Sequence, residues 1–444
     1  MTTTVHKAGV IPIGHPDLVA EIISEIRVSG PMTFAHFMER ALYHPKFGYY
    51  TRATEPEERT GPGRACEDQI AQNRIGQSRI GQNRIGQNRI GWDGDYYTSF
   101  DVHPILAQTL ARQIRQVDIG LGSPDLFTVV EMGPGKGLLA RDFLAACEKD
   151  SPALFARLQY VLIERSPMMI AEQRRALAPW VAAGKVSWLN GLNELADEGL
   201  TGVLLSNELV DAFPVHRIRI VQGEPKELYV AYTDGRFVEQ AGPLSVPALS
   251  QYLARLAAMD ITLPEGYTTE INLEAMAWMK EVARVLGRGI AFTIDYGHTA
   301  QDLYGPDRSC GTLLCYWKQL TSEDPYTRVG LQDMTAHVDF TTLATVGQEA
   351  GLHVTGFTNQ MSFLMSLGVE QELDRLEPGS KEFQEIVQLL RPDGMGRTFK
   401  ILIQHKGIAE PTLDGLKFKP FFGSVLVSRS GQLSAVSPQL KADR

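Results

Sequence analysis

The chain has 444 residues, of which 43% are apolar and 21% are charged, and its formal net charge at pH 7 is −9. This length exceeds that of one average domain. The negative net charge, without a basic stripe, argues against nucleic acid as a partner. The apolar runs are no longer than a strand, which argues against a membrane-spanning helix. The four cysteines and ten histidines form neither a C-x-x-C nor an H-E-x-x-H motif, so we expect free thiols and no metal.

Two helical patterns open the chain. Apolar residues recur at helical spacing over residues 16–43, and Gly30-Pro31 separates the two patterns. Thr33 is the expected N-cap of the second helix. The aromatic turn over residues 43–50 is by itself most simply core packing. We assign residues 1–53 to an N-terminal helical segment.

A repeat of period five, Asn-Arg-Ile-Gly-Gln, occupies residues 73–91. Neither the helical nor the strand period fits it, and a glycine at every fifth residue opposes both structures. We therefore expect an inserted, exposed and loosely held loop over residues 54–93. Its arginines could bind a polyanion, although an insertion without a role is the simpler interpretation. A helix is expected next, from about Pro104 to Arg115.

The stretch over residues 126–144 is typical of a strand, a tight turn and a helix. The strand stops at Glu131, and glycines follow at alternate positions: Gly133, Gly135 and Gly137. Glycine allows a positive φ and a close approach of the backbone to a ligand. The helix directs its free N–H groups into the same turn.

Three ligands could use such a loop. A phosphate-binding P-loop needs Lys-Ser or Lys-Thr after the last glycine, and a dinucleotide fingerprint needs glycine where this chain has Leu138. The remaining pattern, acid-x-Gly-x-Gly-x-Gly, is that of enzymes that bind S-adenosylmethionine (AdoMet). AdoMet would offer its carboxylate to the helix N-terminus and its ammonium to Glu131. A glycine-rich turn without a ligand is the alternative.

Beyond the loop, strands and helices alternate as a parallel sheet requires, and polar residues follow the strands, where open α/β sheets bind ligands. Glu164 follows the next strand. It is placed to bind the ribose hydroxyls of a nucleoside, or alternatively to interact with the dipole of a helix that begins near Ser166. Asn190, after the third strand, would lie near the adenine. Seven strands in total would complete the sheet.

The fourth strand ends at Ser206, and Asn207, Glu208 and Asp211 follow. In an AdoMet enzyme this strand end faces the methyl group, so these carboxylates could orient a guanidinium through bidentate bonds. The alternative is a helix that Asn207 caps and whose first turn contains Glu208 and Asp211. Spacing alone leaves both interpretations open.

Two insertions are expected in the second half. Residues 215–285 contain alternating runs around Gly223, which predict a hairpin. Residues 298–340 are polar and contain several glycines, which is more typical of a cover over a site than of a core element. Strands near residues 352–357 and 398–404, separated by two amphipathic helices, complete the sheet.

Several stretches together resemble one family, the MidA-type methyltransferases, whose mitochondrial members assist assembly of respiratory complex I. The resemblance extends over residues 30–400 in the family's order. The matching stretches are Gly30 to Phe34, His44-Pro45 with Gly48-Tyr49-Tyr50, Gly94 to Ser99, Glu131 to Gly137, Ser206 to Leu209 with Asp211 to Pro214, Asp295-Tyr296-Gly297, Gly311-Thr312-Leu313 with Tyr316, Gln332 to Phe340, and Met395-Gly396 with Phe399-Lys400.

The resemblance implies a class I AdoMet-dependent methyltransferase fold, with a Rossmann-like sheet over residues 94–214 and 286–408 and a tail over 409–444. It also implies symmetric dimethylation of an arginine on the 49-kDa-type complex I subunit, and hence a protein partner, with a homodimer as one option. No transit peptide is evident, which favours a bacterial cytoplasmic member, whereas a eukaryotic one would be expected in the mitochondrial matrix.

Under this hypothesis Glu208 and Asp211 position the guanidinium, and Asp295 or His337 removes a proton. Three further residues would belong to a segment folded over the cofactor: Tyr50, Thr98 and Ser99. One competing hypothesis is an assembly chaperone that keeps the fold and binds a complex I subunit without catalysis. Another is an NAD-dependent oxidoreductase, which Leu138 opposes.

Overall fold

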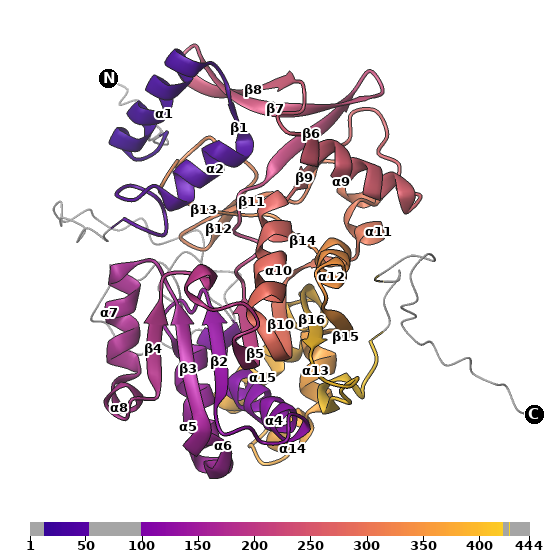
Figure 1. Ribbon diagram of the computed structural model, residues 1–444. Helices are drawn as coiled ribbons and strands as arrows, with labels where there is room; N and C mark the ends of the chain where they lie inside the picture. The colour runs from indigo at the N-terminus through magenta and orange to yellow at the C-terminus, as the bar shows by residue number, and fades with distance from the viewer. Residues whose placement is uncertain (1–12, 53–98, 421–425, 427–444) are drawn as a thin grey trace, which may run out of the picture.

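Figure 1 shows the computed structural model, in which residues 13–52, 99–420 and 426 are described. A large sheet with helices on both faces forms the lower part, and the N-terminal helices lie above it beside a second sheet. The loop expected over residues 54–93 lies outside the described residues, as does Thr98. Within the described ranges, no helix combines the length and the apolar character needed to cross a membrane.

The central sheet contains seven strands in one continuous path, with an eighth short strand beside it. These strands are β2 (Phe127–Met132), β3 (Leu158–Ile163), β4 (Val186–Leu189), β5 (Leu200–Asn207), β10 (Leu286–His298), β14 (Val338–Asp339), β15 (His353–Asn359) and β16 (Phe399–Lys406). Their order is β15-β16-β10-β5-β2-β3-β4, and β14 pairs with β10. From β10 to β4 the strands run parallel, while β16 lies antiparallel between β10 and β15. The predicted Rossmann-like sheet of seven strands is confirmed.

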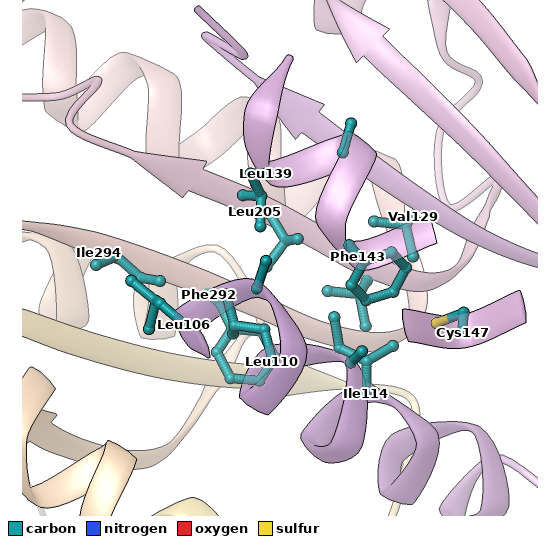
Figure 2. Close-up of a cluster of buried hydrophobic side chains, with 14 of the residues drawn as sticks. Leu106, Leu110, Ile114, Val129, Leu139, Phe143, Cys147, Leu205, Phe292 and Ile294 are labelled. Atoms are coloured by element: carbon teal, nitrogen blue, oxygen red, sulfur yellow. The ribbon is translucent and has the colours of Figure 1, made fainter. Parts of the chain in front are cut away.

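Helices cover both faces of this sheet. The covering helices are α4 (Ile105–Gly120) and α5 (Leu138–Asp150) on one face and α10 (Leu273–Val285) and α12 (Phe340–Glu349) on the other. Because side chains alternate along a strand, Val129 packs in the first core and Val130 in the second. Figure 2 shows Leu106, Phe143 and Phe292 in the first core. Helix α4 continues five residues past its predicted end.

Shorter helices precede or connect the strands of the first half. They are α3 (Ser99–Val102), α6 (Pro152–Arg157), α7 (Pro167–Ala176) and α8 (Ala178–Ala182). Ser166 caps α7 by accepting a bond from the backbone N–H of Met169, so the predicted helix start near Ser166 is confirmed. The turn between each strand and its helix therefore lies at the same edge of the sheet as the glycine loop.

The upper part joins the N-terminal segment to the first insertion. Its elements are α1 (Pro16–Ser29), β1 (Met32–Thr33), α2 (Phe34–Tyr43), β6 (His216–Val221), β7 (Glu224–Thr233), β8 (Arg236–Gly242), α9 (Pro247–Ala258) and β9 (Thr268–Ile271). The Thr33 side chain accepts a bond from the His36 N–H at 3.2 Å, which confirms the predicted cap. The hairpin around Gly223 is also confirmed. Strand β1 pairs with β7, so the two segments share one sheet, which the sequence did not predict.

The second insertion connects the upper part to the central sheet. It contains α11 (Ala300–Leu303) and a three-stranded sheet of β11 (Leu314–Trp317), β12 (Leu320–Ser322) and β13 (Asp333–Thr335). Cys315 and Met334 pack with the N-terminal helices, and the Ala336 N–H donates to the carbonyl of Asp211 at 2.9 Å.

The chain between β15 and β16 folds into four short helices rather than the two that the sequence predicted. They are α13 (Gln360–Ser366), α14 (Val369–Leu373), α15 (Lys381–Leu390) and α16 (Met395–Thr398). Breaks such as the one at Gly368, whose φ is 81°, divide the apolar pattern into shorter pieces. Phe363, Ile386 and Leu389 of these helices complete the core that α4 and α5 form.

Candidate cofactor site and active site

The glycine loop connects β2 to α5 at the carboxyl edge of the sheet. Gly133, Gly135 and Gly137 have φ values of 71°, 50° and 77°, so the predicted positive φ is confirmed at all three. A side chain at Gly133 would also bring its Cβ within 2.9 Å of Leu209 Cδ1. No described side chain caps α5, so the N–H groups of its first turn remain available to a ligand.

A cavity of about 910 Å³ lies beside this loop. Its volume falls within the range of small-molecule sites, about 300–1,000 Å³. The N-terminal segment, the glycine loop, the residues after β3 and helix α10 all contribute to its walls. Its lining includes Glu39, Tyr43, Tyr50, Met132, Lys136, Glu164, Met169, Glu208, Glu274 and Trp278.

Glu164 lines this cavity directly after β3. One carboxylate oxygen accepts the Ser166 N–H at 2.8 Å, and the other accepts the Gln173 side-chain N–H at 3.2 Å. Burial raises its pKa, and these bonds partly offset that effect. Since each carboxylate oxygen has two lone pairs, Glu164 can order the start of α7 and still bind a ligand hydroxyl. The two interpretations of Glu164 are therefore compatible.

Asn190 does not line the cavity. Its side chain is exposed and donates to Glu194 at 3.0 Å. Gly191, Leu192 and Asn193 form the wall at this point instead. The geometry gives the predicted contact between Asn190 and adenine no support, because the chain turns inward only after this residue.

Glu131 borders a second cavity, of about 60 Å³, rather than the large one. One of its carboxylate oxygens accepts the Tyr160 hydroxyl at 2.7 Å. Burial raises the pKa of Glu131 to about 7, although the bond from Tyr160 acts in the opposite direction. The same small cavity is bordered by Asp101 of α3, the helix that Ser99 begins.

Glu208 borders both cavities and has a strained backbone. Its φ is 50°, a left-handed value that costs energy for a residue with a Cβ and that active sites can retain. Its carboxylate accepts bonds from the Asn207 amide at 3.1 Å and the Tyr296 hydroxyl at 3.3 Å. Burial, together with the charge of Asp295, raises the pKa of Glu208 to about 8. Residues 207–214 contain no helix, so the alternative of a capped helix is wrong.

Asp295 holds the loop that carries Glu208. One of its oxygens accepts three backbone N–H groups, from Leu209 at 3.2 Å, Val210 at 2.9 Å and Asp211 at 3.4 Å. The side chain is fully buried and borders neither cavity. Its position fits a role in loop geometry and not the predicted removal of a proton.

Asp211 lies in the same buried acidic group. It is 4% exposed, and its Oδ1 has no hydrogen-bond partner among the described residues. Burial raises its pKa well above the usual value, and the charges of Asp295, Glu208 and Asp333 add to that effect. A group of carboxylates in this state gains most from a cation.

Two tyrosines of the N-terminal segment close the cavity on the side of these acids. The Tyr43 hydroxyl donates to the carbonyl of Ala212 at 2.9 Å, and the Tyr50 hydroxyl donates to Asp333 at 2.7 Å. The two rings stack with their centroids 5.4 Å apart. The aromatic turn, which by itself indicated only packing, therefore also forms a wall of the cavity.

His337 is not brought to either cavity. Its ring lies 5.1 Å from that of His298, and its Nδ1 is buried without a described partner. Burial lowers the pKa of His337 to about 4, and the charges of Arg308 and Lys400 lower it further. A neutral histidine outside the cavities gives the predicted role in proton removal no support.

Several residues of the cavity wall were not identified from the sequence. Glu39 and Glu274 have no motif around them, because each lies on a helix whose other face is apolar. Asp333 borders neither cavity, but it accepts a bond from Tyr50 of the wall; it was part of a matched stretch, and nothing in its spacing indicates that it meets Tyr50, 283 positions away. Contacts between residues so far apart in the sequence can be identified only once the fold is known.

Comparisons with a family model, with related sequences and with solved structures give consistent results. Residues 106–358 match the model of a family described as "Putative S-adenosyl-L-methionine-dependent methyltransferase". A Drosophila melanogaster protein named "Protein arginine methyltransferase NDUFAF7 homolog, mitochondrial" is 26% identical, over 90% of this chain and 87% of its own length. The human NDUFAF7 protein is 22% identical, over 88% and 84%. A crystal structure from Burkholderia thailandensis, bound to S-adenosyl-homocysteine, is 30% identical with a TM-score of 0.75, over 92% of this chain and 98% of that one.

Proposed function

This chain belongs to a family of S-adenosyl-L-methionine-dependent methyltransferases, and from that membership we propose that it transfers the methyl group of AdoMet to an arginine of a protein. AdoMet is the cofactor. The names of the Drosophila and human relatives support arginine as the acceptor. By the family resemblance, the 49-kDa-type subunit of complex I is the substrate that we propose to test first.

The observation that carries this proposal is the acidic group at the methyl-transfer edge of the sheet, in which Asp211 and Asp295 are buried and Glu208 is half-buried. Among the described residues, neither Glu208 nor Asp211 forms an ion pair with a lysine or an arginine. The large cavity is lined by six glutamates and three basic residues, an excess of three acids. AdoMet, with two positive groups and one negative, and a guanidinium would together balance two of them. A cationic acceptor therefore fits this cavity better than a neutral one.

We assign the cofactor to the glycine loop and Glu164. The free N–H groups of α5 suit its carboxylate, and Glu164 suits the ribose hydroxyls. Glu131, at the end of β2 just before the turn, borders the small cavity and suits its ammonium. Bound AdoMet supplies a methyl group that is already activated by the sulfonium charge. The protein then has to align the acceptor nitrogen with that carbon.

Glu208 is the residue to which we assign the acceptor. A guanidinium bound by Glu208 would restore the negative charge that burial disfavours, and Tyr43 and Tyr50 offer ring faces for its plane. Methylation of a guanidinium releases one proton. A carboxylate whose pKa is about 8 accepts such a proton more readily than an exposed one. Asp211 borders neither cavity, so its part in this proposal is electrostatic, through the charge that it and Glu208 share.

The test uses purified protein, AdoMet with a labelled methyl group and the recombinant subunit, followed by peptide mapping. We expect label on arginine with the wild-type protein. With Glu208→Gln we expect transfer to fall at least about 100-fold while S-adenosylhomocysteine still binds. Label on another residue type, or a wild-type rate with Glu208→Gln, would contradict the proposal. Tight binding of the subunit without any product would instead favour the chaperone hypothesis.

A further inference from the structure

Helix α7 directs a single side chain into the interior, and that side chain is polar. Among the ten residues of α7, all of which the structure describes, only Gln173 is buried, and its neighbours Arg174 and Arg175 are exposed. A buried amide costs free energy unless its polar atoms are bonded, and an apolar side chain of similar length would fill the same space without that requirement. The partners of Gln173 therefore indicate what its polar atoms contribute.

The amide of Gln173 connects the glycine loop, Glu164 and strand β4. Its Nε2 donates to the carbonyl of Gly135 at 2.7 Å and to Glu164 Oε2 at 3.2 Å, and its Oε1 accepts the indole N–H of Trp188 at 2.8 Å. These bonds use both hydrogens of Nε2. Because an indole N–H can only donate and a carbonyl can only accept, the three partners permit one orientation of the amide.

Glu164 is thereby held at both of its oxygens. Oε1 accepts the backbone N–H of Ser166 at 2.8 Å, just before α7, and Oε2 accepts the bond from Gln173. A carboxylate has about four lone-pair sites, so two remain for the two hydroxyls of a ribose. Burial raises the pKa of Glu164, and the bonds from Ser166 and Gln173 act against that rise. The two bonds therefore orient the carboxylate and favour its charged form before a ligand binds.

The same side chain also packs against the glycine loop. A Cβ at Gly137 would lie 3.3 Å from Gln173 Cγ, so the side chain is in close contact with the loop at Gly137 and is bonded to it at Gly135. Gln173 borders neither cavity. It therefore contacts both the loop and the carboxylate that we assign to the cofactor, from a position outside the cavities.

We propose that Gln173 is a positioning residue, which fixes the carboxylate of Glu164 relative to the glycine loop so that both hydroxyls of the ribose are bound while the loop holds the rest of the cofactor. With an apolar side chain at position 173, the carboxylate would be free to turn about its own side-chain bonds, and the carbonyl of Gly135 would lose this donor. The role of Gln173 rests on the proposed assignment of Glu164 to the ribose, and it holds whichever acceptor is methylated.

The experiment compares two ligands that differ only at the ribose. Titration calorimetry measures the affinity of the full-length protein for S-adenosylhomocysteine and for its 2′,3′-dideoxy form, which lacks both ribose hydroxyls. We call the ratio of the two affinities the ribose discrimination. Since hydrogen bonds to a charged group are among the stronger ones, two of them should give the wild-type protein a ribose discrimination of about 100-fold or more.

Gln173→Met keeps the length of the side chain and removes its polar atoms. We expect the ribose discrimination to fall about 10-fold, which corresponds to about one hydrogen bond to a charged group. Trp188→Phe keeps an aromatic ring and removes only the N–H that orients the amide, so we expect a smaller loss, about threefold. In a Glu164→Gln background, Gln173→Met should have no further effect on the ribose discrimination, since Gln173 acts through Glu164.

Gln113→Met provides a matched control, because it makes the same change at another fully buried glutamine. Gln113 lies on α4 and borders neither cavity. Its Oε1 accepts the backbone N–H of Gly415 at 2.7 Å and its Nε2 donates to Gln116 at 2.7 Å, so this variant also loses buried hydrogen bonds. We expect its ribose discrimination to match the wild type within about twofold.

A wild-type ribose discrimination in Gln173→Met would overturn the proposal, whether the two affinities stay the same or fall equally, because Gln173 would then only stabilise the fold. Should Gln173→Met not fold, Trp188→Phe decides between the same two results. Equal affinity of the wild-type protein for both ligands, or an unchanged discrimination in Glu164→Gln, would refute the assignment of Glu164 to the ribose and the role of Gln173 with it. Since no acceptor takes part in these titrations, a failure of arginine methylation would not affect them.

Discussion

Replacing Glu208 by glutamine should stabilise the protein at alkaline pH while it lowers the rate of transfer at least about 100-fold. Burial raises the pKa of Glu208 from its ordinary value of 4.5 to about 8. One pKa unit corresponds to about 1.4 kcal/mol, so the largest cost of ionising this carboxyl in the fold is about 5 kcal/mol. Glu208 retains partial exposure to solvent, which reduces that cost, and we expect about 2 kcal/mol.

The direction of this change of stability with pH follows from proton linkage. A carboxyl whose folded-state pKa is raised does not lower stability below pH 4.5, where both states are protonated. Its penalty grows as the pH rises from 4.5 to about 8, because the unfolded chain ionises first, and stays constant above that. Glutamine does not titrate. The free energy of unfolding of Glu208→Gln, relative to wild type, should therefore increase between pH 5 and pH 8.5.

Urea denaturation followed by tryptophan fluorescence at four pH values from 5 to 8.5 measures this difference. In Glu208→Gln, the fall of the free energy of unfolding with rising pH should be smaller than in wild type but still present, since Asp211 and Asp295 remain in the group. Glu224→Gln, an exposed glutamate at the start of β7, is the control and should follow the wild type at every pH. A difference between Glu208→Gln and wild type that stays constant across this range would refute the reasoning.

Three further substitutions test other parts of the site. Asp295→Asn removes the charge that accepts three backbone N–H groups, so we expect a loss of about 2–3 kcal/mol in urea denaturation and at least a 100-fold loss of transfer, with nucleoside affinity nearly unchanged. A variant as stable as wild type would show that the loop holds its shape without this carboxylate. Tyr50→Phe removes one hydrogen bond to Asp333 and should lower the free energy of unfolding by about 1 kcal/mol. It should also raise KM for the acceptor, measured in the transfer assay, more than Kd for the cofactor, measured by calorimetry. A larger effect on the Kd of the cofactor would count against a place for Tyr50 on the acceptor side. Gly133→Ala meets both a left-handed φ and a contact at 2.9 Å, so S-adenosylhomocysteine affinity should fall about 10-fold or more, and an unchanged affinity would mean that the loop can shift without cost.

The sheet could be predicted because its information is local. Each strand is a short apolar run that ends in polar residues, and the glycines at 133, 135 and 137 have a conformational requirement that a sequence displays directly. The position of Glu164 at the cavity could be predicted for the same reason, because the carboxyl ends of parallel strands share one edge.

The acceptor side of the site depends on contacts that no local pattern contains. The role of Asp295 depends on three N–H groups more than 80 positions earlier, and the capped helix that Asn207 could have begun is replaced by the loop that these bonds hold. Asn190 and His337 were chosen by their neighbours along the chain, but the fold turns both away from the cavities. Spacing identifies the residues at a strand end and not the direction in which each one points.

The pairing of β1 with β7 has a consequence for biosynthesis. Met32 pairs with Val230, so the first helices to leave the ribosome have their partner strand nearly 200 residues later. The upper part cannot assemble until that strand has been translated, whereas the sheet around β2 and β3 forms from segments about 30 residues apart. A nascent chain therefore exposes the apolar faces of α1 and α2 until about half of it has been made, and the cavity acquires its aromatic wall after the strands around β2 and β3 have formed.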